Sequence, residues 1–274
     1  MQPGLIQGQH IAVHLPNLMG FEQVVDMLLE HFDTPDLAGS VVVLGDYVHY
    51  PAAHFRERYP GRRIIIYQLE QMVGSVTWHS VEQIIGHLRG ADEIWEYDPL
   101  NVEYLGWHGV RVDRVIPMIF TERLRRLPEN PDPPTDVLFA GSLNDRRYRI
   151  IFDLERWFYG RATLTWMFGY RGPQFDRALM DAKIILNLHA FEPWHRQEQT
   201  RIFYPLINGK MVISEASETN WFGDAIVEAP EADLGPTILH WLEDDRWRSF
   251  GPAAAERYQW MSRSWLADRF PSGS

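Results

Sequence analysis

The chain has 274 residues, enough for one large or two small domains, and 45% of them are hydrophobic, as in a folded protein. It contains no cysteine, which excludes disulfides and thiolate metal sites. The formal net charge of −11 argues against a general affinity for nucleic acid, which needs a basic surface, although it leaves room for a local basic groove.

Targeting signals are missing from the sequence. No apolar run approaches the length that crosses a membrane, and the N-terminal MQPGLIQGQH lacks the basic and apolar regions of a signal peptide. We therefore expect a cytoplasmic protein without a membrane span.

The first half of the chain alternates short apolar runs with amphipathic segments. The runs are rich in Ile and Val and too short for buried helices, so they predict strands that are buried on both faces. We place these strands at residues 10–16, 40–45, 62–70, 93–97 and 110–116. We place the helices at residues 21–32, 81–88 and 101–107. The alternation indicates a parallel sheet with helices on both faces.

A segment rich in proline and acidic residues, PENPDPPTD, follows and has no periodicity, which is typical of a linker. The alternation then restarts. We predict strands at 136–142, 162–169, 183–188, 211–214 and 225–230. We predict helices at 144–160, at 175–182, in the segment that ends at Asn208-Gly209, at 232–242 and at 246–265, the last with a break near Gly251-Pro252.

These patterns predict an α/β protein with two Rossmann-like domains that face a cleft. A single extended α/β domain is the alternative. The boundaries that we assign are 1–127 for the N-terminal domain, 128–135 for the linker, 136–250 for the C-terminal domain and 251–274 for a closing helix and tail.

The stretch from Lys183 to Ser217 holds the densest group of functional side chains. It forms a strand–loop–helix–strand unit, whose loop lies at the carboxyl edge of the sheet, where ligands bind. The loop and the first helical turn carry His189, Glu192, His195, Arg196, Glu198 and Arg201. Glu198 and Arg201 share a helix face and could bind sugar hydroxyls and phosphate, or form an ordinary surface ion pair.

Two further turns could bind a nucleotide. In AGSLNDRR a strand ends at Gly141-Ser142 and a helix opens near Asn144, so backbone amides and Arg147 could hold a diphosphate. The alternative is a plain turn capped by Asn144. In FGYRG, Tyr170 could stack on a nucleobase, or the turn could be structural.

Metal chemistry is not expected. The spacing His189, Glu192, His195 is not the i, i+4 pair of a zinc helix, and Pro193 disfavours a regular helix there.

Polar residues also lie at or near the strand ends of the first half: His14, Asp46, Gln68, Glu70 and Tyr97. A carboxylate or histidine among them could serve as a base toward an acceptor hydroxyl. We favour Asp46 or His14, and a structural role is the alternative for each residue.

The order of these motifs resembles the group 1 glycosyltransferases of the GT-B fold, including their CgeB-like branch. The blocks that carry the resemblance are IIIYQLEQ, ADEIWEYDPLNVEYL, DVLFAGSLNDRR, AKIILNLHAFE and EQTRIFYPLINGKMVISE. The resemblance implies an acceptor in the N-terminal domain, a nucleotide-sugar donor in the C-terminal one, and a last helix that crosses back to the first domain.

The resemblance also implies residue roles. Gly141 and Ser142 match the donor-phosphate turn, Arg201 matches the arginine that precedes the helix motif, and Glu215 follows its strand as in many members. The chain departs from the family where its Arg-x-Phe-Glu pattern would fall, because residue 204 is tyrosine.

The expected function is thus a metal-independent glycosyltransferase with a nucleotide-sugar as co-substrate, no cofactor and an acceptor that the sequence does not identify. His189, Glu198, Asp46 and His14 are the candidate catalytic residues. A glycosyltransferase-like binding protein without turnover is one alternative, and a transferase that acts on modified DNA bases is another, although the acidic charge opposes nucleic acid as a partner.

Overall fold

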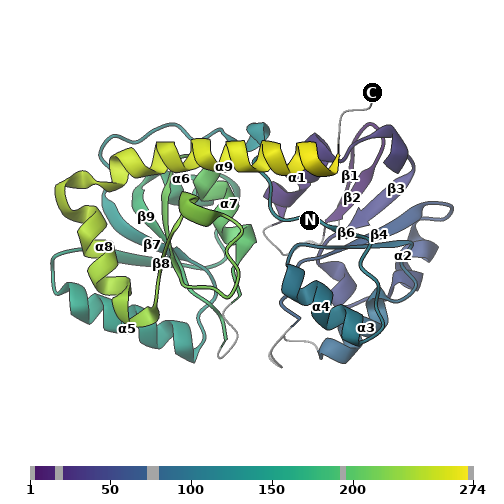
Figure 1. Cartoon of the computed structure of the whole chain (residues 1–274), viewed down its shortest axis with the longest axis horizontal. Helices are drawn as coiled ribbons and strands as arrows, with labels where there is room; N and C mark the ends of the chain where they lie inside the picture. The colour runs from purple at the N-terminus through teal and green to yellow at the C-terminus, as the bar shows by residue number, and fades with distance from the viewer. Residues whose placement is uncertain (1–3, 16–20, 73–79, 192–195, 271–274) are drawn as a thin grey trace. The chain divides into compact units, whose positions relative to one another are not determined.

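The computed structural model describes residues 4–15, 21–72, 80–191 and 196–270. The chain divides into two compact units, Met1–Arg123 and Leu124–Ser274. Each unit is a parallel or nearly parallel sheet with helices on both faces, so the predicted α/β class is confirmed (Figure 1).

Unit 1 contains a six-stranded sheet in its described residues, with strand order β1-β2-β3-β4-β5-β6. The first pair is antiparallel and the remaining pairs are parallel. The strands are β1 (Gly4–Gln7), β2 (Ala12–Leu15), β3 (Ser40–Val43), β4 (Arg63–Gln68), β5 (Glu93–Glu96) and β6 (Arg114–Val115). The helices are α1 (Glu22–His31), α2 (Ala52–Arg58), α3 (Val81–Leu88) and α4 (Pro99–Trp107).

Successive side chains along the buried strands of unit 1 point to opposite faces of the sheet, and each face packs against different helices. Ile66 and Ile94 face a cluster that includes Phe55 of α2 and Ile84 of α3. Trp95 points to the opposite face and packs against Phe32 at the end of α1, with ring centroids 5.5 Å apart. Both faces are covered, as the continuous apolar runs predict.

Unit 2 contains a five-stranded parallel sheet in its described residues, with strand order β11-β10-β9-β7-β8. The strands are β7 (Thr135–Ala140), β8 (Leu164–Met167), β9 (Ala182–Asn187), β10 (Met211–Glu215) and β11 (Val227–Ala229). The helices are α5 (Asp145–Phe158), α6 (Gly172–Met180), α7 (Gln199–Ile207), α8 (Leu234–Leu242) and α9 (Trp247–Arg269).

The core of unit 2 lies between the sheet and two helices, α5 and α8. Phe139 of β7 and Ile213 of β10 belong to one cluster with Ile150 of α5 and Ile238 of α8. Helices α7 and α9 pack against β10. In Figure 1, α5 appears below the strands of this unit and α9 above them.

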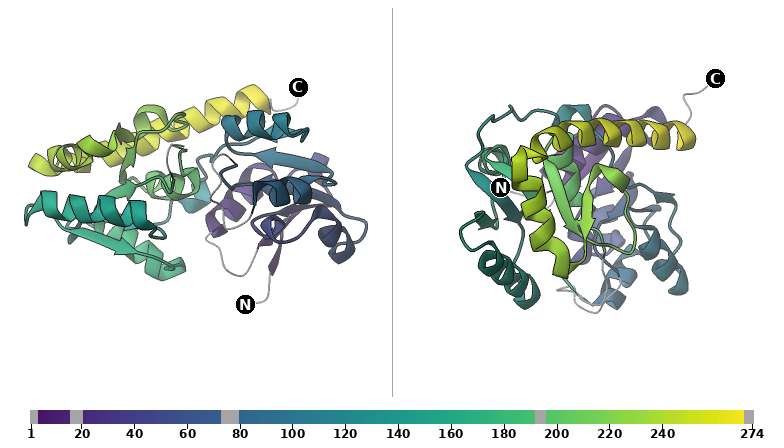
Figure 2. Two further views of the ribbon diagram at one scale, coloured as in Figure 1. Left: turned by 90° about the horizontal axis from the view of Figure 1, so that it is seen from below. Right: turned by 60° about the vertical axis from the view of Figure 1, so that its left-hand side comes forward.

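Some sequence-based predictions of secondary structure were wrong. The hairpin strand β1 and the helix α2 were not foreseen, because β1 is exposed and α2 has few apolar residues. The last helix has no break at Gly251-Pro252, and Figure 2 shows α9 as one continuous yellow helix. Pro205 lies inside α7, and the helix continues past it to Ile207.

No helix in the described part of the chain is long and apolar enough to cross a membrane.

Candidate functional site at the carboxyl edge of the second sheet

The strand order of unit 2 creates a switch point between β7 and β9. These strands are neighbours, whereas β8, which lies between them in sequence, is added at the far side of β7. Connections from β7 and from β9 therefore leave in opposite directions, and ligands of doubly wound sheets bind in the crevice that this opens at the carboxyl edge. Gly141 and Ser142 follow β7, and His189 follows β9, so the expected site residues flank this switch point.

Arg201, in the first turn of α7, lies directly against Gly141. A Cβ built at Gly141 would lie 3.2 Å from both Cζ and Nη1 of Arg201 and 3.0 Å from Cζ of Phe139. Nη1 of Arg201 has no hydrogen-bond acceptor in the described chain. The glycine therefore provides the space in which Nη1 of Arg201, the buried end of a partly exposed side chain, comes close to the turn.

The carbonyl oxygen of Gly141 is held as well, because it accepts a 2.8 Å hydrogen bond from Nε1 of Trp166. Sequence reasoning did not assign a role to Trp166 or to Phe139. The signal that could have pointed to Trp166 is its place at the end of the strand before FGYRG, although a tryptophan there is more often a packing residue.

Glu198 lies between two arginines. Its Oε1 accepts a 2.9 Å hydrogen bond from Nη2 of Arg147 and lies 3.6 Å from Nη1 of Arg201. Burial by itself raises the pKa of Glu198, but the charges of Arg201 and Arg147 outweigh burial and hold that pKa below its ordinary value. Glu198 is therefore a carboxylate at neutral pH.

Arg147 does not point toward solvent, which corrects the expectation that it binds phosphate directly. Its side chain is only 2% exposed, and it stacks over Phe139 with 5.6 Å between Cζ and the ring centroid. Burial lowers the pKa of Arg147 to about 10, so the guanidinium is still charged at neutral pH. Its nitrogens donate to the carbonyl oxygens of Ser142, Leu188 and His189 and to Glu198.

Glu215 is also engaged within the protein. Both of its carboxylate oxygens accept hydrogen bonds from Arg146, and Oε2 additionally accepts from the backbone amide of His189. Arg146 contacts Glu231 as well, at 3.2 Å. Because the carboxylate is 3% exposed and already paired, the expected donor-binding role of Glu215 does not fit this geometry. The residue joins β10 to the loop that follows β9.

His189 is buried, which corrects the expectation that it acts on substrate. Nδ1 lies 2.7 Å from the carbonyl oxygen of Arg196, and Nε2 lies 3.0 Å from that of Ala216. A carbonyl oxygen only accepts, so both contacts are hydrogen bonds only if the ring is an imidazolium.

Two more of the predicted residues of unit 2, Asn144 and Tyr170, lie at the same sheet edge. Asn144 caps α5, since its side chain accepts a hydrogen bond from the amide of Arg147. Tyr170 follows β8 and is half exposed. Glu192 and His195 lie outside the described residues. Among residues that the structure does describe, no group of three His, Cys, Asp or Glu side chains could hold a metal ion.

In unit 1, the structure joins His14 to Asp46. Nε2 of His14 lies 2.7 Å from Oδ2 of Asp46, and Nδ1 lies 2.7 Å from the hydroxyl oxygen of Tyr59. If Nε2 donates to the carboxylate, the tyrosine hydroxyl can donate to Nδ1 of the neutral ring. The His14 side chain is fully buried and that of Asp46 is 17% exposed, so the carboxylate is the accessible member of this pair.

A second polar network in unit 1 was only partly foreseen. Glu96 accepts hydrogen bonds from the side chains of Gln68 and Asn101 and from the amides of Tyr97 and Asp98. Burial raises the pKa of Glu96 to about 8. Gln68 and Glu96 are the last residues of β4 and β5, and polar residues at these strand ends are the part of the network that the sequence indicates.

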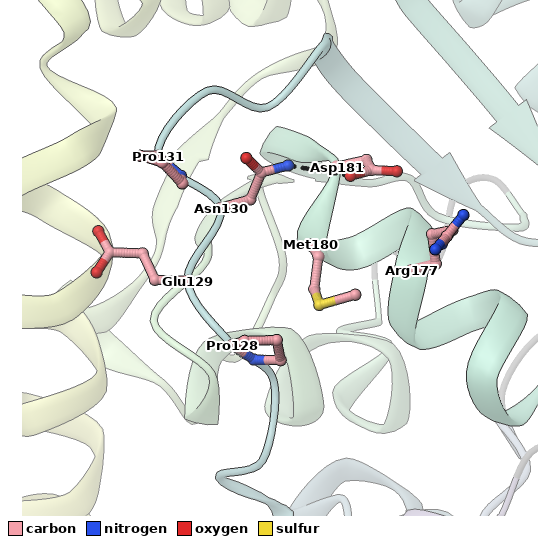
Figure 3. A pocket seen from close by; sticks show the side chains of 7 residues that line it. All are labelled: Pro128, Glu129, Asn130, Pro131, Arg177, Met180 and Asp181. Carbon is pink, nitrogen blue, oxygen red and sulfur yellow. Dashed lines mark hydrogen bonds between the residues drawn. The ribbon is translucent and has the colours of Figure 1, made fainter.

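Unit 2 also has a pocket of about 350 Å³, which lies at the amino edge of its sheet (Figure 3). Its walls are the segment Pro128–Pro131 and the end of α6, and a 3.0 Å hydrogen bond joins Asn130 to Asp181 across them. Asp181 directly precedes β9, so this pocket faces the amino end of the strand rather than the residues near Gly141.

No model of a known protein family and no curated protein sequence matches the chain. Its fold is similar to several solved structures. An S. aureus TarM variant in complex with fondaparinux, alpha-GlcNAc-glycerol and UDP has a TM-score of 0.57 at 10% identity, covering 82% of this chain and 54% of TarM. Sucrose-phosphate synthase from Thermosynechococcus elongatus has a TM-score of 0.54 at 13% identity, covering 82% of this chain and 69% of the synthase.

Anabaena HepE in complex with UDP and glucose has a TM-score of 0.52 at 13% identity, covering 95% of this chain and 87% of HepE. The chain spans about half the length of TarM. At these identities the likeness concerns the fold, and it confirms the predicted GT-B-like class with two Rossmann-like units.

Proposed function

We propose that this chain is a glycosyltransferase that transfers a sugar from a nucleotide-sugar to an acceptor hydroxyl without a metal ion. Solved structures of similar fold support the proposal, since HepE was determined with UDP and glucose and TarM with UDP. The contact between Arg201 and Gly141 at the switch point carries the proposal within this chain.

The donor diphosphate would lie on the turn at Gly141, Ser142 and Asn144, against Arg201. The amides at the start of α5 and the positive end of its dipole favour an anion there. When the bond between the sugar and the diphosphate breaks, negative charge grows on the leaving oxygen. A guanidinium and amides that are already in place stabilise this charge more strongly than the ground state, which lowers the barrier.

Tyr170, at the end of the neighbouring strand, is the proposed stacking partner of the nucleobase. It is half exposed and follows Gly169, whose φ of +77° turns the chain directly after β8. A stacked base contributes about 1–3 kcal/mol in proteins that bind nucleotides this way.

On the acceptor side, Asp46 is the proposed base if the reaction inverts the sugar. Its partner His14 is buried with both ring nitrogens in contact with Tyr59 and Asp46, so it orients the carboxylate rather than meeting substrate itself. A carboxylate with one oxygen fixed can accept a hydroxyl proton on the other.

A binding protein without turnover is the second candidate, and Tyr204 favours it. Family resemblance places a carboxylate at this position, but the tyrosine hydroxyl donates to Asp176 at 2.6 Å and lies 3.2 Å from Nε of Arg126. Tyr204 is also buried, so it does not replace that carboxylate at the proposed site.

Incubation with a panel of nucleotide-sugars in EDTA separates the two candidates. The enzyme releases nucleoside diphosphate in the presence of a suitable acceptor, and a slower release to water is expected without one. A protein that binds the same nucleotide-sugar but releases no diphosphate with any acceptor tested would be the binding protein instead.

A further inference from the structure

We infer that Arg147 and Glu198 are positioning residues, which hold Arg201 against Gly141 and do not bind the donor themselves. The inference rests on the proposed donor site. It replaces two expectations from the sequence, that Arg147 contacts the phosphates and that Glu198 binds sugar or ribose hydroxyls.

Arg147 connects three segments of the carboxyl edge. Through Nη1 it reaches the carbonyl oxygen of Ser142 at 3.1 Å, in the turn after β7. Through Nη2 it reaches the carbonyl oxygen of Leu188 at 2.8 Å, after β9. Nη2 also donates to Glu198 at 2.9 Å, at the start of α7. The guanidinium thus fills the floor of the switch point, and its donors are used inside the protein.

Glu198 connects Arg147 to Arg201. The same carboxylate oxygen, Oε1, faces Nη2 of Arg147 and Nη1 of Arg201. Without that oxygen, two guanidinium groups would repel each other at short range in a partly buried site. Glu198 also holds the arginine through the main chain, because its carbonyl oxygen accepts a 2.9 Å hydrogen bond from the amide of Arg201.

This arrangement leaves Arg201 as the outermost of the three charged groups. Its side chain is 30% exposed, compared with 2% for Arg147 and 16% for Glu198. A long arginine side chain loses conformational entropy when it binds a ligand, and the shared carboxylate removes part of that loss in advance. The donor would therefore meet one arginine that two less exposed residues have already placed.

Two substitutions that keep the charge test these positioning roles. Glu198→Asp shortens the side chain that carries the carboxylate, and Arg147→Lys removes the planar guanidinium. Because the net charge of the site is unchanged, a change in affinity reports geometry. The probes are inorganic pyrophosphate and a panel of nucleoside diphosphates, with affinities measured by isothermal titration calorimetry in EDTA. We expect Glu198→Asp to weaken pyrophosphate and the best nucleoside diphosphate by the same factor, about tenfold.

The two probes separate the possible roles of Glu198. Pyrophosphate has no ribose, so a carboxylate that binds ribose would weaken only the nucleoside diphosphate when shortened. That result, or unchanged affinity for both probes, would overturn the inference. Asp136→Glu is the matched control, since Asp136 pairs with Lys183 at 2.6 Å near the amino ends of β7 and β9. It should lower the melting temperature without changing either affinity.

A readout without ligand keeps the inference separate from the proposed function. NMR signals of the Arg201 guanidinium should show slow motion and slow solvent exchange in the wild-type chain and faster motion in Glu198→Asp and Arg147→Lys. If the wild-type chain binds no probe, the proposed donor site fails. If the Arg201 signals are equally mobile in all three proteins, the positioning roles fail even when nucleotides bind.

Discussion

The guanidinium of Arg201 lies so close to Gly141 that a side chain at position 141 would press against it. An added Cβ would lie 3.2 Å from Cζ of the arginine, and the ring tip of Phe139 closes the other side at 3.0 Å. The glycine therefore lets the guanidinium approach the turn this closely, and a Cβ at position 141 would push the guanidinium away by a few tenths of an ångström.

Gly141→Ala should weaken the affinity for nucleoside diphosphates by about tenfold or more, because even a small displacement of a bound charge costs affinity. Calorimetric titration measures the change. Gly86→Ala is a suitable control, since nothing lies within 4 Å of a Cβ built at Gly86, in the exposed part of α3. The control should leave affinity unchanged and stabilise the fold by about 0.5–1 kcal/mol.

Gly251→Ala should unfold or severely destabilise unit 2. A Cβ at Gly251 would lie 2.0 Å from the carbonyl oxygen of Gly209 and 3.2 Å from the amide nitrogen of Met211. Both obstacles are backbone, so α9 must move away from β10, at a cost of about 3 kcal/mol or more. Urea denaturation measures this loss. The control is Gly106→Ala in α4, where an added Cβ meets no atom within 4 Å and no loss is expected. Equal stability of Gly251→Ala and Gly106→Ala would contradict the packing described here.

Glu96 should make stability depend on pH. Burial raises its pKa from 4.5 to about 8, so the folded state holds this proton more tightly than the unfolded state. Its stabilising contribution is full below pH 4.5 and declines as the pH rises toward 8. The difference in unfolding free energy between the wild-type chain and Glu96→Gln, measured in urea from pH 5 to 9, should therefore fall with rising pH. A flat or rising difference would exclude this assignment.

Asp46→Asn should lower sugar transfer by about 100-fold while nucleotide affinity stays unchanged, because an amide cannot take the hydroxyl proton. His14→Gln should have a smaller effect, since His14 acts through Asp46. Both rates come from diphosphate release at saturating donor. Equal activity of Asp46→Asn and wild type would remove Asp46 from the mechanism.

Much of the fold could be predicted because buried parallel strands have a distinct composition. The run IIIY of β4 and the run KIILN of β9 are apolar on both faces and short, which is typical of a strand in the middle of a parallel sheet. In contrast, β1 is exposed throughout, and α2 buries only Ala52 and Phe55, so neither gave a periodic signal.

The sequence placed a candidate site at one sheet edge but did not separate the roles of its residues. A sheet edge follows from strand ends, which brought Gly141 and Arg201 into one prediction. The acceptors that turn Arg147 inward are backbone carbonyls of Ser142 and Leu188, which every residue has and no sequence pattern reveals. For the same reason, the burial of His189 between two carbonyl oxygens could not be foreseen.

The most direct test of the donor site is a thermal-shift comparison of the wild-type chain and Arg201→Ala with nucleoside diphosphates in EDTA. A ligand at 100 times its dissociation constant adds about 2.7 kcal/mol to stability, which is well within reach of the method. We predict that one nucleoside diphosphate raises the melting temperature of the wild-type chain and leaves that of Arg201→Ala unchanged. No rise with any nucleotide, or an equal rise in both proteins, would contradict the proposed site.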